Sequence, residues 1–156
     1  MKKLLLSIST ALMVIFGITS CQQDPVKECR KAAEQGDAES QVALGHCYYD
    51  GNGVNQDYAE AVKWYMKAAD QGLASAQAAL GNCYILGDGV IQDDAEAVQW
   101  FTKAADQGDV NGLYSLGLCY YEGIGVDQDL EAAREWFKKA ADQGFTEALY
   151  YLKEIQ

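Results

Sequence analysis

A block of the form Lys-Ala-Ala-(Glu/Asp)-Gln-Gly occurs four times in this chain, and each copy begins 36 residues after the one before it. The four copies occupy residues 31–36, 67–72, 103–108 and 139–144. Two other segments keep the same register: Leu-Gly-x-Cys-Tyr begins at Leu44, Leu80 and Leu116, and Gly-x-Gly-Val begins at Gly51, Gly87 and Gly123. A fixed period between about 20 and 50 residues is typical of solenoids, in which each repeat buries its apolar face against its neighbours.

Each unit contains two amphipathic segments with helical spacing. In the second segment of the first unit, Trp64 and Tyr65 each stand three or four residues from both Ala61 and Ala68, which places these residues on one face of a helix. The sequence therefore predicts an all-α solenoid of antiparallel helix pairs over residues 25–156. Its parts are a half repeat at 25–36, full repeats at 37–72, 73–108 and 109–144, and a closing half repeat at 145–156.

Helix boundaries are marked by residues that cap free backbone groups. Asp57 with Glu60, and Asp93 with Glu96, have the spacing of an acidic capping box at the start of a helix. Asp24 is a candidate cap for the first helix, with Pro25 in its first turn, and Gly72 and its equivalents suit the C′ position at a helix end.

Two sets of residues recur in every unit and are expected to serve packing. Gly45, Gly81 and Gly117 lie inside the first helix of each unit, where glycine costs about 1 kcal/mol relative to alanine, so we expect a close contact between helices there. The aromatic pairs are expected in the core; they are Trp64-Tyr65, Trp100-Phe101 and Trp136-Phe137.

The first 20 residues differ from the repeats and resemble a lipoprotein signal peptide. Lys2 and Lys3 precede an uncharged, largely apolar stretch that ends at Cys21, and small residues before a cysteine are typical of a lipobox. We expect residues 1–20 to be removed, Cys21 to be lipidated and residues 21–24 to form a linker. Gln22, rather than Asp, after the cysteine favours the outer membrane of a Gram-negative bacterium over the inner one. Because the lipid on Cys21 would be the anchor, we expect the chain to contact the membrane only through this N-terminal lipid.

The charge of the chain limits its partners. The formal net charge is −11, and removal of Lys2 and Lys3 would make the mature chain more acidic still. An acidic surface repels phosphate backbones, which argues against binding to nucleic acid. The Gly-x-Gly-Val segments lack the remaining residues of a phosphate-binding fingerprint.

The sequence offers no recognisable catalytic centre. His46 is the one histidine, and the residues from 21 onward contain no Ser-x-x-Lys, His-Glu-x-x-His or Gly-x-Ser-x-Gly pattern. We expect no enzymatic activity, no cofactor and no metal site, with His46 on the surface or in a groove.

The cysteines have different expected roles. Cys47, Cys83 and Cys119 occupy one repeat position, so their Cα atoms should lie well beyond the roughly 7 Å that a disulfide tolerates. We expect all three to be buried thiols that act as small apolar side chains. Cys29 and Cys47 lie on neighbouring predicted helices, and the sequence leaves open whether they form a disulfide.

Taken together, the Leu-Gly, Tyr, Gly-x-Gly-Val, Gln-Asp, Ala-x-x-Trp-(Tyr/Phe) and Lys-Ala-Ala-Asp-Gln-Gly segments resemble the Sel1-like repeat, a relative of the tetratricopeptide repeat. The resemblance covers residues 25–156 and implies a right-handed superhelix. It also implies roles in envelope or exopolysaccharide assembly or in host interaction. Some cysteine-rich members bind or weakly hydrolyse β-lactams, but their two cysteines per unit are replaced here by Ala33 and Gln41, and by Ala69 and Gln77.

In tetratricopeptide-like arrays the first helices line a concave groove, and residues that vary between units are candidates for partner contact. The candidates here are Glu39, Val42, His46, Tyr49, Asp50, Ser75, Ala78, Asn82, Ile85, Leu86, Asn111, Tyr114, Leu118, Tyr121 and Glu122. The sequence thus predicts a monomeric, membrane-tethered adaptor that holds a protein partner in this groove. The alternatives are a weak β-lactam-binding protein or hydrolase, and a regulator of an envelope signalling protein.

Overall fold

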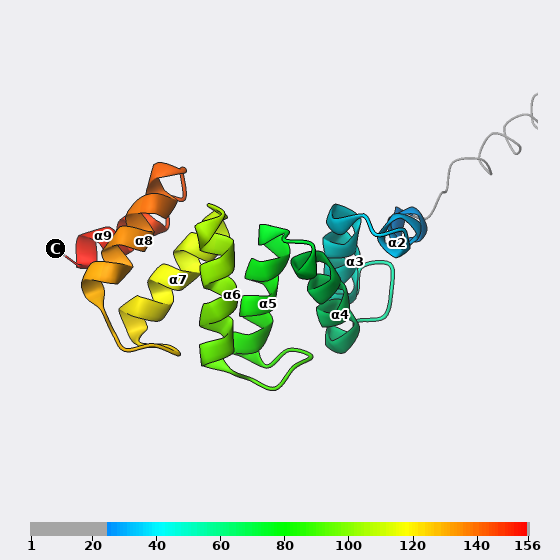
Figure 1. Cartoon of the computed structure of the whole chain (residues 1–156), viewed down its shortest axis with the longest axis horizontal. Helices are drawn as coiled ribbons and strands as arrows, with labels where there is room; N and C mark the ends of the chain where they lie inside the picture. Colours follow the sequence, from blue (N-terminus) through cyan, green and yellow to red (C-terminus); the bar gives the residue numbers. More distant parts are fainter. Residues whose placement is uncertain (1–24, 156) are drawn as a thin grey trace, which may run out of the picture.

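The computed structural model describes residues 25–155, and these residues form helices and connecting turns without a β-strand. The helices are α2 (Pro25–Glu34), α3 (Ala38–Asp50), α4 (Tyr58–Asp70), α5 (Ala74–Leu86), α6 (Asp94–Asp106), α7 (Val110–Glu122), α8 (Leu130–Asp142) and α9 (Ala148–Glu154). They follow one another along the long axis of the molecule, with α2 and α9 at opposite ends (Figure 1). The prediction of an all-α solenoid is confirmed. Asp24 and Cys21 lie outside the described residues.

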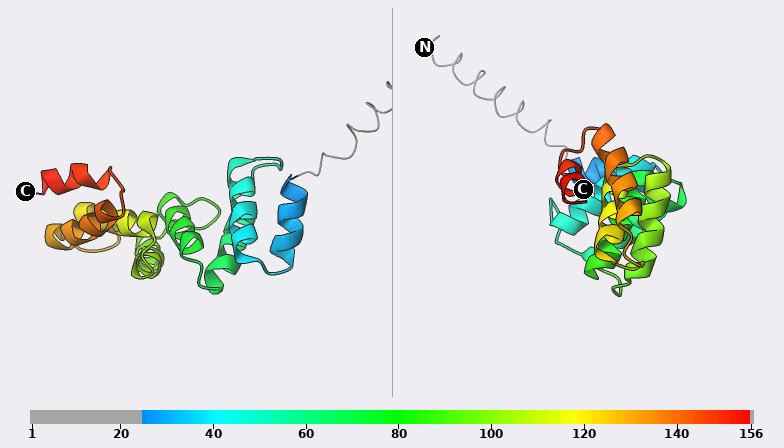
Figure 2. Two further views of the ribbon diagram at one scale, coloured as in Figure 1. Left: turned by 90° about the horizontal axis from the view of Figure 1, so that it is seen from above. Right: turned by 90° about the vertical axis from the view of Figure 1, so that its left-hand side faces the viewer.

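Contacts between helices are local in the chain. Each helix packs on the helices before and after it, and the first helices of successive units also meet where α5 contacts α7. The view from above shows the same succession from α2 to α9, as expected when every unit is covered by its neighbours (Figure 2). Among residues 25–155, no helix is long and apolar enough to cross a membrane.

The capping residues predicted from the sequence hold the helix ends. The Asp57 carboxylate accepts a hydrogen bond from the Glu60 backbone N–H at 2.9 Å, and Asp93 accepts one from Glu96 N–H at 3.0 Å. At the end of α4, Gly72 has a φ of +87°, and the N–H of the next residue, Leu73, donates to the Ala68 carbonyl. This Schellman arrangement satisfies carbonyls that the helix leaves free and turns the chain into the next unit.

Within each unit, a glycine of the first helix lies against an aromatic ring of the second. A Cβ atom added to Gly45 would stand 2.5 Å from Cε1 of Tyr65, and one added to Gly117 would stand 2.8 Å from Cδ1 of Phe137. Gly81 meets Phe101 even more closely. The predicted close contact is therefore confirmed, because the absence of a side chain at these glycines leaves room for the ring against the helix.

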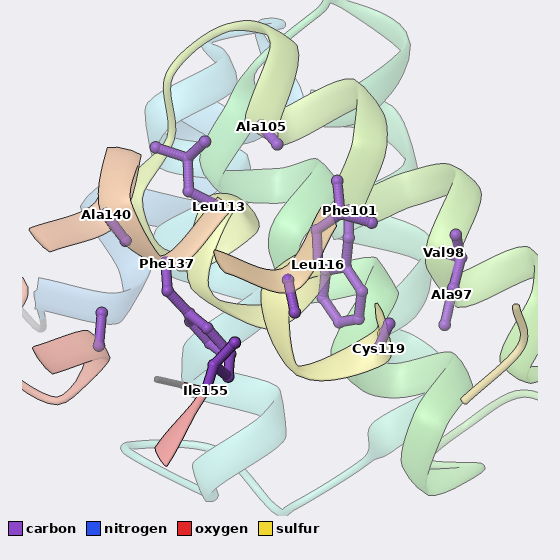
Figure 3. Close-up of a cluster of buried hydrophobic side chains, with 12 residues drawn as sticks. Ala97, Val98, Phe101, Ala105, Leu113, Leu116, Cys119, Phe137, Ala140 and Ile155 are labelled. Atoms are coloured by element: carbon purple, nitrogen blue, oxygen red, sulfur yellow. The ribbon is translucent and has the colours of Figure 1, made fainter. Parts of the chain in front are cut away.

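The core runs through the array as linked clusters. One of them, drawn in Figure 3, joins side chains of α6, α7 and α8 to Ala148 of α9 and to Ile155. Tyr65, Phe101 and Phe137 are fully buried, as predicted.

The tryptophans depart from the prediction, because only Trp64 is buried and its equivalents Trp100 and Trp136 are half-buried. Their outer faces are covered by lysines of the next helical turn. Lys67 Nζ lies 3.8 Å from the Trp64 ring centroid, with Lys103 on Trp100 and Lys139 on Trp136 in the same arrangement.

We predict that Gly81→Ala destabilises the protein. Helix propensity alone would favour alanine by about 1 kcal/mol, but the new methyl group would collide with the buried Phe101 ring, and overpacking of this kind costs about 1–3 kcal/mol. Urea unfolding followed by circular dichroism should show a lower midpoint. The control Asn82→Ala, at the next and exposed position, should change the stability by less than about 0.5 kcal/mol. A higher midpoint for Gly81→Ala would contradict the packing described.

Candidate protein-binding groove

A hollow of about 210 Å³ opens between α3, α4 and α5. It is lined by His46, Tyr49, Tyr65, Ala79, Asn82, Cys83 and Leu86. Tyr65, whose ring lies on Gly45, belongs to this lining, so the contact that joins the two helices of the unit also shapes the hollow.

A second hollow, of about 110 Å³, lies one unit further along the array. It is lined by Asn82, Ile85, Phe101, Ser115, Leu118, Cys119 and Ile124. All of these except Ile124 stand 36 residues after a residue of the first hollow, so the repeat builds the same feature twice. Asn82 belongs to both linings, and we call the two adjoining hollows the groove.

Hydrogen bonds fix the polar side chains of the first hollow. The Tyr49 hydroxyl donates to Oδ2 of Asp88 at 2.6 Å, and this hydrogen bond, together with burial, raises the pKa of Tyr49. The Tyr65 hydroxyl lies 2.8 Å from Nδ1 of His46, and burial raises the pKa of Tyr65. Both phenols therefore stay neutral at physiological pH and serve as walls of the hollow rather than as acids.

The thiols of the groove are poor nucleophiles. Cys83 and Cys119 are buried, and burial raises the pKa of each thiol to about 11. Because the thiolate is the reactive form, these groups act as apolar lining at neutral pH. Among residues 25–155 there is no group of three or more His, Cys, Asp or Glu side chains that could hold a metal ion.

Six of the predicted contact residues line the groove. They are His46, Tyr49, Asn82, Ile85, Leu86 and Leu118. Leu86 is 61% exposed, which is unusual for a large apolar side chain. Five others lie outside the lining of the two hollows: Glu39, Asp50, Asn111 and Glu122 are exposed, and Ser75 is half-buried.

Four predicted contact residues are placed differently by the structure. Val42 and Ala78 are 7% and 3% exposed, and they belong to the core because their position in the unit faces the neighbouring helices. Tyr114 occupies the same position in the third unit and is half-buried in an aromatic cluster. Tyr121 belongs to the same cluster. Its members are Tyr114, Tyr121, Phe137, Phe145 and Tyr151.

The closing half repeat fills the place where a third hollow would lie. Tyr151 of α9 stacks on Phe137, with ring centroids 4.8 Å apart and an interplanar angle of 15°. It also meets Tyr121 edge-on, at 5.2 Å between centroids. Tyr151 stands 36 residues after Ser115 and 72 after Ala79. The two hollows are therefore open where this repeat position carries a small residue, and the third is filled where it carries a ring.

Sequence reasoning missed Ala79, Ser115 and Asp88. The first two are small and occupy one repeat position, so comparing side-chain size along the repeat could have revealed the hollows. Asp88 lies in a loop, and nothing in the sequence pattern links it to Tyr49, 39 residues earlier.

The free cysteines near the start of the array do not form a disulfide in the structure. Cys29 and Cys47 are both free and half-buried, and the Cys29 thiol donates to the Ser40 carbonyl at 3.3 Å. The prediction that Cys47 is buried, like Cys83 and Cys119, was therefore wrong. Its unit stacks on α2, which carries Cys29 in place of a large ring.

Glutamines join neighbouring helices by hydrogen bonds. Gln41 donates to the Ala33 carbonyl at 3.1 Å and accepts a hydrogen bond from Gln71 at 2.8 Å. Gln107 donates to Gln77 at 2.8 Å in the next unit. The same hydrogen bond between glutamines is thus repeated in two successive units.

Lysine and arginine are unevenly distributed among the helices. Helices α3, α5 and α7, together with the loops that follow them, contain no lysine or arginine. The basic residues within 25–155 all lie on α2, α4, α6, α8 and α9. Carboxylates lie near the groove instead: burial is the main cause of the raised pKa values of Tyr65, Cys83 and Cys119, and Asp50 adds to that of Tyr65, Asp88 to that of Cys83, and Asp94 and Glu122 to that of Cys119. The lining of the groove is therefore largely apolar, and α3 and α7 beside it carry carboxylates but no lysine or arginine.

Comparison with known proteins identifies the family. The Sel1 repeat model matches residues 29–37, 38–73, 74–109 and 110–145, which is most of the chain. The chain belongs to the Sel1 repeat family. None of the curated proteins matches it significantly.

Solved structures share the fold. A protective antigen of uropathogenic Escherichia coli with an SLR fold is 51% identical over 77% of this chain, with a TM-score of 0.75, and this chain spans 26% of that protein. A Sel1 repeat protein from Oxalobacter formigenes is 38% identical over 82% of this chain and 96% of its own, with a TM-score of 0.73. Cysteine rich protein B of Helicobacter pylori, at 24% identity and a TM-score of 0.65 over 81% of this chain and 96% of its own, shows the fold alone.

We predict slow alkylation of the groove thiols. With a pKa of about 11, Cys83 and Cys119 should react with iodoacetamide at pH 8 at about a hundredth of the rate of an exposed cysteine or less, because the thiolate fraction is that much lower. The rate should rise about tenfold per pH unit up to pH 10. Site-resolved mass spectrometry measures both. Equal rates for native and urea-unfolded protein at pH 8 would contradict the burial described.

Proposed function

We propose that this protein is a membrane-tethered adaptor that binds a protein partner through the groove. Sel1 repeat proteins commonly mediate protein–protein interactions, and the family is generally non-enzymatic. The observation that carries the proposal is the pair of adjoining hollows on the first helices, with Leu86 exposed at their edge. An exposed apolar side chain beside a hollow is typical of a surface that a partner covers.

The lining supports binding rather than chemistry. The two thiols within it are protonated at neutral pH, and the Tyr49 and Tyr65 hydroxyls are engaged in hydrogen bonds. A hydrolase would need an activated nucleophile beside a base. The one imidazole, on His46, is exposed and faces a phenol rather than an activated nucleophile.

Photo-crosslinking in cells tests the adaptor role. p-Benzoylphenylalanine placed at Asn82 should capture one discrete protein partner, because Asn82 is exposed and shared by both hollows. The same probe at Gln99, exposed on α6, is the matched control and should not capture that protein. Leu86→Arg should reduce the Asn82 product at least fivefold. Equal capture from both positions, or no capture from Asn82, would contradict the proposal.

The membrane tether is proposed on the lipobox-like residues that end at Cys21, in an outer-membrane location. Wild-type protein expressed in a Gram-negative host should incorporate labelled palmitate and sediment with membranes. Cys21→Ser should lose the label and appear in the soluble fraction. Sedimentation of the variant with membranes to the wild-type extent would contradict the tether.

A further inference from the structure

The occupant of the groove can be deduced from the one hollow that the chain fills by itself. In the third unit, the ring of Tyr151 lies on Phe137 and against Tyr121. The corresponding rings of the first unit are Tyr65 and Tyr49, and both line the first hollow. Phe101 and Ile85 occupy the same positions in the second hollow. The two hollows thus lie where Tyr151 lies in the third unit, and the edges of Tyr65 and Phe101, each 2% exposed, form part of their walls.

What keeps the two hollows open is the size of one residue. Ala79 and Ser115 end short of the space that Tyr151 occupies in the closing half repeat. Stacked or edge-on rings are each worth about 0.5–1.5 kcal/mol beyond the area they bury. A ring supplied by a partner would therefore meet Tyr49 and Tyr65 in the first hollow, and Phe101 with the aliphatic Ile85 in the second.

The charge around the groove indicates the charge of the partner segment. Glu39 and Asp50 on α3, Asp88 in the loop after α5 and Glu122 on α7 are acidic, and α3, α5 and α7 carry no lysine or arginine. The lysines of α4, α6 and α8 include three that cover tryptophan rings on the second helices. Basic residues in the partner would be attracted to the groove, and an acidic partner would be repelled.

We propose that the groove binds a basic segment of a partner protein that inserts two aromatic side chains, one into each hollow. Helices in contact lie about 10 Å apart, and an extended chain advances about 3.1–3.3 Å per residue, so the two aromatic residues are separated by about three or four positions. This inference rests on the proposed adaptor function and gives the partner its chemistry. A second copy of this chain is the competing occupant, because Tyr150 is 62% exposed at the end of the array.

The test uses a fluorescently labelled peptide, Lys-Tyr-Lys-Ser-Tyr-Lys with blocked ends, and the full-length protein. Fluorescence anisotropy should show binding that weakens at least tenfold when either tyrosine is replaced by alanine. Replacing the lysines by glutamate should weaken it at least tenfold as well. A peptide with the glutamates that binds as tightly would overturn the charge argument and with it the proposal.

Protein variants locate the binding in the hollows. Ala79→Tyr and Ser115→Tyr place a ring where Tyr151 carries one, and each should weaken peptide binding at least tenfold. The matched control is Ala43→Tyr, the same substitution at the same repeat position of α3, where the side chain is exposed and lines neither hollow. Equal loss of binding in Ala43→Tyr would overturn the proposal.

A second pair of variants avoids any effect on packing. Leu86→Arg changes an exposed residue of the first hollow, and Ile91→Arg changes a residue that is 90% exposed in the next loop and outside both linings. Binding should fall at least tenfold in Leu86→Arg alone. Equal effects of the two substitutions would show that the peptide is held by charge alone, without insertion of its aromatic side chains into the hollows, which contradicts the proposal.

Two outcomes separate this inference from the adaptor function itself. If the wild-type protein does not bind the peptide at millimolar concentration while Asn82 still captures a partner in cells, the aromatic and basic chemistry is wrong and the adaptor function stands. If neither experiment gives binding, both fail. Analytical ultracentrifugation should show a monomer, and a concentration-dependent dimer abolished by Ala79→Tyr would assign the groove to a second copy and overturn the proposal.

Discussion

The contact between a glycine in the first helix and an aromatic ring in the second is the constraint on which the rest of this solenoid depends. Because Gly45, Gly81 and Gly117 have no side chain, the rings of Tyr65, Phe101 and Phe137 lie directly on the backbone of the neighbouring helix. This sets how closely the two helices of a unit approach and keeps each ring buried. The first two rings also line the hollows of the groove, so the element that holds a unit together prepares its binding surface.

The repeat made most of the fold predictable from the sequence. Its register located the helix pairs, the aspartate caps such as Asp57 and the glycine at the end of α4, because these features depend on local backbone chemistry that recurs in every unit. The ring-bearing positions were predicted for the same reason. The predicted burial of Trp100 and Trp136 is only partial, since their outer faces are covered by lysines rather than by another helix.

The groove was predicted less well, because variation between units was taken as a sign of exposure. Position 42 and its equivalents carry Val42, Ala78 and Tyr114, which differ in size although the first two are core residues, so the neighbouring helices absorb the difference. Tyr121 packs in the aromatic cluster because the third unit is covered by α9, where Tyr151 occupies the repeat position of the small Ser115 and Ala79. Both errors concern contacts between neighbouring helices, which the periodicity of a single sequence does not encode.

These contacts explain how the closing half repeat differs from the two units before it. The closing half repeat covers the last ring with its own Tyr151, while the two preceding units leave a hollow in that place beside first helices that lack lysine and arginine. The most direct measurement is a set of intermolecular nuclear Overhauser effects between the aromatic protons of the bound basic peptide and the methyl groups of the protein. The account predicts contacts to Ala79 and Leu86 in one hollow and to Ile85 and Leu118 in the other. Contacts confined to α4 and α6, on the helices that carry the lysines, would contradict it.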